Sequence, residues 1–366
     1  MNQAITPLVM PKWGLEMRQG TVSGWRVAEG TRLTVGTPVV DVETDKISNA
    51  VEAPDAGLLR RKVAKDGEVL PVKALLAVLA EPEISDAQID AYIAAFETPE
   101  AEADEADEAA AFQRAEVDGI RVRYARRGPD DGVPVLFVHG FGGDLGNWLF
   151  NLDAVAEQAP VIALDLPGHG QSDARLPGTS LAALADFVAH FLDHIGVAHV
   201  HWVGHSMGGA IGAQFALQQP ARLASLTLIA SAGLGPEINA GYIDGFVQSA
   251  SRRELKPVVE MLFADPSLVS RQLLDELLRY KRIDGVTELF GALGGALFAG
   301  GRQAETPATR LPASLPLLVI WGEHDRVIPA THAKAAPAGA TVAVLPGAGH
   351  MVMMEKAGEV NALLRK

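Results

Sequence analysis

The stretch that decides the fold is HWVGHSMGGAIGAQFAL, residues 201–217. Its opening residues, His201–Val203, predict a short strand, and Ala210–Leu217 has the composition of a helix. Between them lies Gly204-His205-Ser206-Met207-Gly208, a G-x-S-x-G pattern in a strand-to-helix context. Glycine on both sides of Ser206 permits a sharp turn, because a side chain at either place would clash. The stretch therefore predicts a nucleophile elbow, which lifts the serine hydroxyl above the end of a sheet.

Short apolar runs alternate with helical stretches on both sides of this elbow, from about Ala115 onward. Continuous apolar runs are typical of buried parallel strands, so the alternation predicts a doubly wound α/β sheet. The predicted strands are Val135–Val138, Val161–Leu164, His201–Val203, Leu226–Ile229, Leu317–Trp321 and Val342–Leu345. Helical periodicity interrupts this pattern from Gly233 to about Pro312. It predicts a cap over Ser206 that shapes an acyl pocket.

A serine hydroxyl is a weak nucleophile unless a general base activates it. In this strand order the acid and the base should follow the serine, in the sequence Ser, Asp, His. His350 follows the last predicted strand, and Asp325 follows the strand before it. We predict that His350 is the base and that Asp325 holds its tautomer. Glu323 is the alternative acid; His324 and His332 are the alternative bases, although both precede the last strand.

The first strand of the sheet runs into the glycine-rich loop His139-Gly140-Phe141-Gly142-Gly143. Glycine lets a backbone approach a substrate closely. We expect the backbone N–H groups of Phe141 and Met207 to form an oxyanion hole, which stabilises the charge of a tetrahedral intermediate. His139 is expected to order this loop by hydrogen bonding. His205 is expected to pack the elbow and not to act as a base.

Residues 1–80 follow a different pattern, with short alternating runs rich in Val, Gly and Thr that predict a small all-β domain. An internal repeat at an offset of 37 residues aligns Glu29-Gly30 with Asp66-Gly67. Two similar halves predict a quasi-symmetric sandwich. Between the halves, Thr44-Asp45-Lys46-Ile47 joins two predicted strands, and this turn places Lys46 at an exposed hairpin tip.

An acidic stretch separates the two patterns. Residues Glu97–Glu108, ETPEAEADEADE, hold seven carboxylates and no base, which predicts an extended linker, with a solvated helix as the alternative. Just before it, Ser85 and Gln88 have capping-box spacing at the start of a short predicted helix. That helix is expected to pack on a neighbouring domain, or alternatively to dock a partner. The predicted division is therefore 1–80, 81–111 and 112–366, with the cap at about 233–312.

Composition excludes several classes of function. The formal charge is 31 − 45 = −14 and no run of Lys and Arg suggests a basic face, so neither nucleic acid nor an anionic membrane surface is an expected partner. The absence of cysteine excludes disulfides, zinc–thiolate sites, iron–sulfur clusters and a cysteine nucleophile, and no metal site is predicted. The first thirteen residues lack a signal-peptide pattern and no apolar run has the length of a membrane span. A cytoplasmic location is therefore expected.

Residues 1–80 resemble the lipoyl domains of the 2-oxoacid dehydrogenase class. The matching residues are Met10-Pro11-Lys12, Gly20, Glu29-Gly30, Glu43-Thr44-Asp45-Lys46 and Ala53-Pro54-Asp55-Ala56-Gly57. The resemblance implies a lipoyl group on Lys46, added by a lipoate-attaching enzyme. The related biotin carriers place methionines beside their lysine, where this chain has Asp45 and Ile47. Residues 112–366 resemble the α/β-hydrolase superfamily through the elbow and the predicted triad.

A lipoyl domain followed by an α/β-hydrolase fold resembles the acyltransferase components of acetoin dehydrogenase systems. The resemblance implies a thiamin-dependent component that cleaves acetoin and acetylates the lipoyl arm. It also implies acetyl transfer to coenzyme A, and a flavin-containing dihydrolipoyl dehydrogenase that reoxidises the arm. The chain lacks the two-helix partner-binding domain of other 2-oxoacid acyltransferases, and their carboxyl-terminal His and Asp-Gly signature. Two alternatives remain at this point: a lipoyl-bearing thioesterase or carboxylesterase, and a carrier or scaffold with an inert hydrolase fold.

Overall fold

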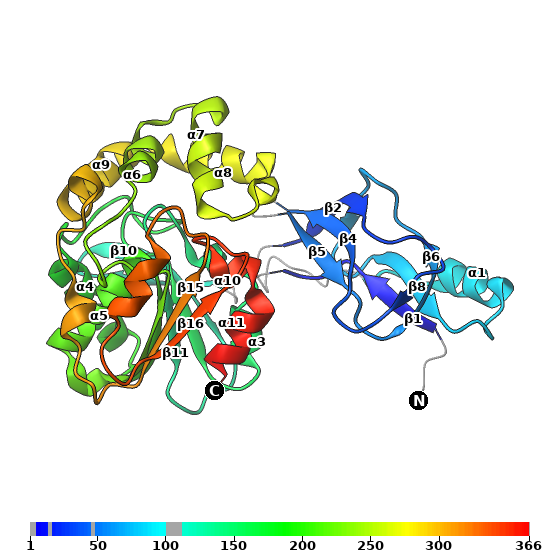
Figure 1. The fold of residues 1–366 in the computed structure, drawn as a ribbon, viewed down its shortest axis with the longest axis horizontal. Helices are drawn as coiled ribbons and strands as arrows, with labels where there is room; N and C mark the ends of the chain where they lie inside the picture. Colours follow the sequence, from blue (N-terminus) through cyan, green and yellow to red (C-terminus); the bar gives the residue numbers. More distant parts are fainter. Residues whose placement is uncertain (1–4, 14–16, 45–47, 100–111, 366) are drawn as a thin grey trace. The chain divides into compact units, whose positions relative to one another are not determined.

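The computed structural model describes residues 5–13, 17–44, 48–99 and 112–365 (Figure 1). They form two units, an amino-terminal β-domain and a larger α/β domain. The multidomain architecture predicted from the sequence is confirmed.

The amino-terminal domain is a sandwich of two four-stranded antiparallel sheets. One sheet has the order β1 (Ile5–Val9), β8 (Leu75–Ala80), β6 (Gly57–Lys62) and β3 (Arg32–Leu33). The other has the order β5 (Ser48–Glu52), β4 (Pro38–Glu43), β2 (Gln19–Trp25) and β7 (Val69–Pro71). The core between them is built from small and branched side chains, among them Val22, Val40, Val42, Leu59 and Leu76, all fully buried. The sandwich agrees with the quasi-symmetric arrangement that the internal repeat predicts.

Helix α1 (Asp86–Ala95) covers the outer face of this domain. Ser85 caps its amino end, and the reciprocal bonds of a capping box join Ser85 and Gln88. Ile89 is fully buried against Leu75 and Val78 of β8, so that strand is covered on both faces. The apolar side of α1 thus packs on the β-domain that precedes it in the chain, which is the first of the two alternatives given for this helix.

The larger domain is built on an eight-stranded sheet in the order β16-β15-β14-β13-β11-β12-β10-β9. Six strands pair in parallel: β11 (Val135–Val138), β12 (Val161–Leu164), β13 (Val200–His205), β14 (Leu223–Ile229), β15 (Leu317–Gly322) and β16 (Thr341–Leu345). These are the six strands that the apolar runs predict, with ends that differ by a few residues. The antiparallel pair β9 (Phe112–Val117) and β10 (Ile120–Arg127) was not predicted.

Helices cover both faces of this sheet (Figure 1). The pair α4 (Leu181–His194) and α5 (Met207–Gln218) lies on one face, and α3 (Leu152–Ala156), α10 (Val352–Glu355) and α11 (Ala357–Leu364) lie on the other. The predicted cap is helical and contains α6 (Ala240–Gln248), α7 (Arg252–Val259), α8 (Arg271–Lys281) and α9 (Val286–Leu297).

Candidate active site

Ser206 occupies the sharp turn between β13 and α5. Its φ of 53° and ψ of −118° lie outside the conformations that side chains ordinarily adopt, as in a nucleophile elbow. The flanking glycines are required by space. A Cβ at Gly204 would lie 2.4 Å from the Gly208 carbonyl oxygen, and one at Gly208 would lie 2.2 Å from that of Val138. The turn therefore depends on both glycines of the motif.

Asp325 and His350, which lie 25 residues apart in the chain, meet beyond the ends of β15 and β16. Nδ1 of His350 and Oδ2 of Asp325 are 2.8 Å apart, and both side chains are almost completely buried. The other oxygen of Asp325 accepts the N–H groups of Val327 and Ile328, at 2.8 and 2.9 Å. The Trp321 indole donates to Oδ2 at 3.0 Å. A carboxylate held by several donors fixes the imidazole with its proton on Nδ1, which leaves Nε2 free to accept a proton.

The alternative acid and bases are placed elsewhere. Glu323 and His324 are exposed and face one another at 3.9 Å. His332 is buried, but its Nε2 lies 2.7 Å from a carboxylate oxygen of Glu237. The geometry therefore favours Asp325 and His350 over these three side chains.

His205 links the elbow to His350, the predicted base. Its Nε2–H donates to the main-chain carbonyl of His350 at 3.1 Å, and the two imidazole rings lie 4.7 Å apart. Burial lowers the pKa of His205 well below its usual value, which keeps this ring neutral.

Within the described part of the chain no hydrogen bond joins Ser206 to His350. Catalytic hydrogen bonds of this kind are often long before substrate binds.

The loop after β11 lies beside Ser206. A Cβ at Gly140 would be 2.9 Å from the Cβ of Ser206. His139 orders the loop, as expected: its Nδ1–H donates to the Gly140 carbonyl at 2.8 Å, and its Nε2 accepts the N–H of Leu166 at 3.0 Å. Burial lowers the pKa of His139 to about 4, so it stays neutral and serves the fold.

The two backbone N–H groups predicted to form the oxyanion hole belong to Phe141 and Met207. Phe141 lies in the loop after β11, and Met207 is the first residue of α5. Among the described residues, neither backbone N–H has a hydrogen-bond acceptor. Buried N–H groups normally have a partner, so two free donors beside Ser206 are consistent with binding an oxyanion.

Aromatic side chains from the cap pack on the loop that carries Phe141. The Phe141 ring has edge contacts with Phe246 of α6 and Phe290 of α9, at centroid distances of 5.7 and 5.1 Å. At Gly142, where φ is 71°, a Cβ would lie 2.5 Å from the Phe246 ring. Cap helices α6 and α9 therefore pack directly on the loop that carries Phe141.

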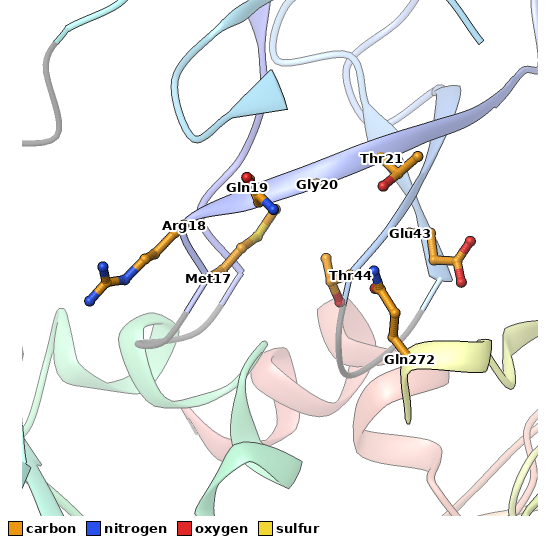
Figure 2. Close-up of a pocket in the computed structure, with 8 residues that line it drawn as sticks. All are labelled: Met17, Arg18, Gln19, Gly20, Thr21, Glu43, Thr44 and Gln272. Carbon is orange, nitrogen blue, oxygen red and sulfur yellow. The ribbon is translucent and has the colours of Figure 1, made fainter. Parts of the chain in front are cut away.

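In the amino-terminal domain, strands β4 and β5 form the hairpin that was predicted to carry the modified lysine. Their register pairs Glu43 with Ser48, so residues 44–47 make the connection. Lys46 itself lies outside the described residues. Figure 2 shows the adjacent end of the sheet, where Gln19 to Thr21 of β2 run alongside Glu43 of β4. The connection between these two paired strands is the segment in which the sequence predicts the attachment lysine.

The structure shows neither a metal site nor a membrane-spanning helix in the part that it describes. No group of three or more potential metal-ligating His, Asp or Glu side chains occurs among the residues described. Likewise, no helix in the described segments is both long and apolar enough to cross a membrane.

Comparison with known proteins agrees with this architecture. A family model described as the alpha/beta hydrolase fold matches residues 133–357, and one described as biotin-requiring enzyme matches residues 6–79. Among solved structures, the meta-cleavage product hydrolase CumD from Pseudomonas fluorescens IP01 matches 69% of this chain and 95% of its own. Its TM-score is 0.62 and its identity is 23%, a likeness that shows the fold alone.

Two curated relatives match the whole chain, and both are named dihydrolipoyllysine-residue acetyltransferase component of acetoin cleaving system. The protein from Cupriavidus necator is 63% identical over 367 residues, which cover 100% of this chain and 98% of the relative. The protein from Pseudomonas putida is 50% identical over 372 residues, which cover 100% of both chains. The chain therefore belongs to the family of acetyltransferase components of acetoin cleaving systems, in which a lipoyl domain precedes an α/β-hydrolase fold.

Proposed function

We propose that Ser206 of this acetyltransferase receives the acetyl group from a lipoyl arm on Lys46 and passes it to coenzyme A. The observation that carries the proposal is the buried hydrogen bond between His350 and Asp325, next to a serine elbow. In the proposed division, residues 1–80 carry the acyl group, 81–111 link the domains, and 112–366 catalyse the transfer. A lipoyl group supplies a thiol on a long arm, which holds acetyl as a thioester.

The first half of the proposed reaction acetylates the serine. Nε2 of His350 removes the proton from Ser206 Oγ, and this oxygen attacks the thioester carbonyl carbon. The N–H groups of Phe141 and Met207 hold the resulting oxyanion. As the carbon–sulfur bond breaks, His350 gives its proton to the departing thiolate. Asp325 stabilises the imidazolium throughout and keeps its own charge.

The second half returns the enzyme to its starting state. His350 removes the proton from the thiol of coenzyme A, whose sulfur attacks the acetyl-Ser206 carbonyl carbon. Collapse of the second tetrahedral intermediate releases acetyl-coenzyme A, and His350 returns the proton to Ser206 Oγ. Neither protons nor electrons are gained or lost over the cycle. Direct attack of the coenzyme A thiol on the thioester, with His350 as the base, is the alternative route to the same products.

The partners proposed for this chain follow from its family. Its relatives are named as components of acetoin cleaving systems, so we place it in a multienzyme system. The proposed neighbours are a thiamin-dependent acetoin dehydrogenase component, which acetylates the arm, and a dihydrolipoyl dehydrogenase, which reoxidises it. A lipoate-attaching enzyme would modify Lys46. We propose a cytoplasmic location for the system.

The test supplies the purified protein with S-acetyl-dihydrolipoamide and coenzyme A, and quantifies acetyl-coenzyme A and free acetate. We expect mostly acetyl-coenzyme A, and a loss of at least about 10³-fold in Ser206→Ala, because the nucleophile is removed. Ser267→Ala, which removes an exposed cap serine, is the matched control. Mostly acetate would indicate a hydrolase, and no turnover by either form would favour an inert scaffold.

A further inference from the structure

One segment of the cap, residues 260–265, packs on the loop that carries His350. The N–H of Met351 donates to the Leu262 carbonyl at 3.0 Å. A Cβ at Gly349 would lie 2.6–2.9 Å from three backbone atoms of the cap segment, so there is no space between them. The residues on both sides of His350 therefore contact this part of the cap.

Glu355, the last residue of α10, joins the same two segments through its carboxylate. Oε2 accepts the N–H of Gly349 at 2.6 Å, and Oε1 accepts the N–H of Ala264 at 2.7 Å. The backbone of Asp265 adds a further hydrogen bond. Burial raises the pKa of Glu355, and these N–H groups oppose that shift. Each oxygen thus holds one segment, the cap on one side and the residue before His350 on the other.

The acid side of the triad is tied to the same cap segment. Arg326 follows Asp325 in the chain, and its Nη2 donates to the carbonyl of Phe263 at 2.8 Å and also to that of Glu260. Residues 260–265 are therefore attached to the neighbours of both Asp325 and His350. Neither Arg326 nor Glu355 is part of the predicted triad.

We infer that Glu355 is a positioning residue that aligns His350 with the cap segment 260–265, so that the base is in place when this segment is seated. The inference rests on the proposed function, because it assigns His350 the role of base. Its physical basis is that both oxygens of Glu355 accept hydrogen bonds. A glutamine side chain has an NH2 group in place of one of the two oxygens. This NH2 group would face one of the two backbone N–H groups and could not accept its hydrogen bond.

The test compares Glu355→Gln with Glu359→Gln, an exposed glutamate four residues on. The main readout is the rate constant for modification of Ser206 by phenylmethanesulfonyl fluoride, followed by mass spectrometry. The rate constant reports on the molecules that are folded. A variant that is partly unfolded would therefore show a smaller modified fraction, but an unchanged rate constant. We expect Glu355→Gln to slow modification by about 10- to 100-fold, the effect of a misplaced catalytic group, and Glu359→Gln to match wild type.

Acetyl transfer supplies the second readout. In Glu355→Gln, kcat should fall by a similar factor while KM for S-acetyl-dihydrolipoamide stays within about twofold, because Glu355 contacts no substrate atom in the proposed reaction. Modification and transfer at wild-type rates would overturn the inference. If wild-type transfer survives Ser206→Ala, the proposed function fails, and the modification rates still test Glu355. If Glu355→Gln does not fold, Arg326→Gln is measured instead: slower modification supports the coupling and a wild-type rate contradicts it.

Discussion

Ser206 shows how a short sequence pattern fixes the position of one side chain. The G-x-S-x-G spacing predicts a strained turn, and the structure has a positive φ at the serine with glycines packed against backbone atoms. The order of strands then points to Asp325 and His350, which lie in hydrogen-bond contact. These features could be predicted because each depends on the few residues that follow a strand.

His205 and Glu355 show where such prediction stops. His205 bonds to a residue 145 positions away, and Glu355 to the cap 91 positions away. Nothing in the local pattern around either residue indicates such a partner. Contacts of this kind depend on how the cap and the loops pack, so only the folded chain reveals them.

The pairing of Asp325 with His350 predicts a specific loss of activity. Asp325→Asn keeps the shape but favours the wrong imidazole tautomer, so we expect the acetyl-transfer rate to fall by about 10²–10⁴-fold. Steady-state kinetics with S-acetyl-dihydrolipoamide and coenzyme A measures the loss. Glu323→Gln alters the exposed alternative acid and should retain wild-type activity. The opposite ranking of the two variants would assign the acid to Glu323.

Buried neutral histidines should make the hydrolase domain sensitive to acid. Burial lowers the pKa of His139 to about 4 and that of His169 to about 3. Below about pH 6.5 these two histidines bind protons in the unfolded chain but not in the folded chain, so their contribution to the free energy of unfolding falls as the pH falls. We therefore expect urea denaturation to give lower stability at pH 5 than at pH 7.

Replacement of His169 measures how much this side chain contributes to the fall in unfolding free energy between pH 7 and pH 5. His169→Phe loses the hydrogen bond to the Pro167 carbonyl but keeps an aromatic ring against Phe290. The drop in unfolding free energy from pH 7 to pH 5 should shrink by about 2 kcal/mol, because one titrating group is gone. His199→Asn, at an exposed site, is the control. A drop as large as in wild type would mean that His169 does not contribute.

At the scale of elements, the apolar runs predicted the six parallel strands. Five of them, β11 to β15, are mostly buried, which explains their continuous apolar sequence. The edge strand β16 also has an apolar run, although Val342 and Val344 are exposed. The antiparallel pair β9 and β10 was missed because charged and polar residues interrupt its apolar runs. Strand β10 carries Arg121, Arg123, Arg126 and Arg127, and its neighbour β9 is an edge strand with only two buried residues. Because charged residues interrupt the apolar sequence, a search for apolar runs does not find these two strands.

Helix α1 offers a test of local capping. Ser85→Ala removes one half of the capping box and should lower the stability of the helix by about 1 kcal/mol. Hydrogen exchange of the α1 amides should accelerate correspondingly, by about fivefold, while exchange in β4 stays unchanged. Equal protection of α1 in the variant and the wild type would mean that packing of Ile89 alone sets its stability.

At the scale of the whole molecule, a carrier domain and a serine site share one chain. Tethering raises the concentration of a carried group near its enzyme without any new contact. The acidic linker was predicted from its charge alone, and most of it lies outside the described residues. A change of the proposed attachment lysine, Lys46, separates the step that each domain supplies.

Lys46→Arg should block delivery and leave the chemistry intact. The variant cannot be lipoylated, so acetyl-coenzyme A formation from acetoin in the reconstituted system should cease. Transfer from free S-acetyl-dihydrolipoamide should continue at the wild-type rate, because the serine site is unchanged. Lys12→Arg is the control for a second lysine of the same domain. Continued acetoin-dependent turnover by Lys46→Arg would place the lipoyl group elsewhere.

The central claim is that acetyl passes through Ser206, and trapping the covalent intermediate tests it most directly. Protein mixed with S-acetyl-dihydrolipoamide in the absence of coenzyme A would be quenched in acid, digested and analysed by mass spectrometry. We predict acetylation of the peptide that contains Ser206, and its loss within one turnover when coenzyme A is added. Formation of acetyl-coenzyme A without acetyl-Ser206, at a rate that Ser206→Ala retains, would contradict the account and establish direct transfer between the two thiols.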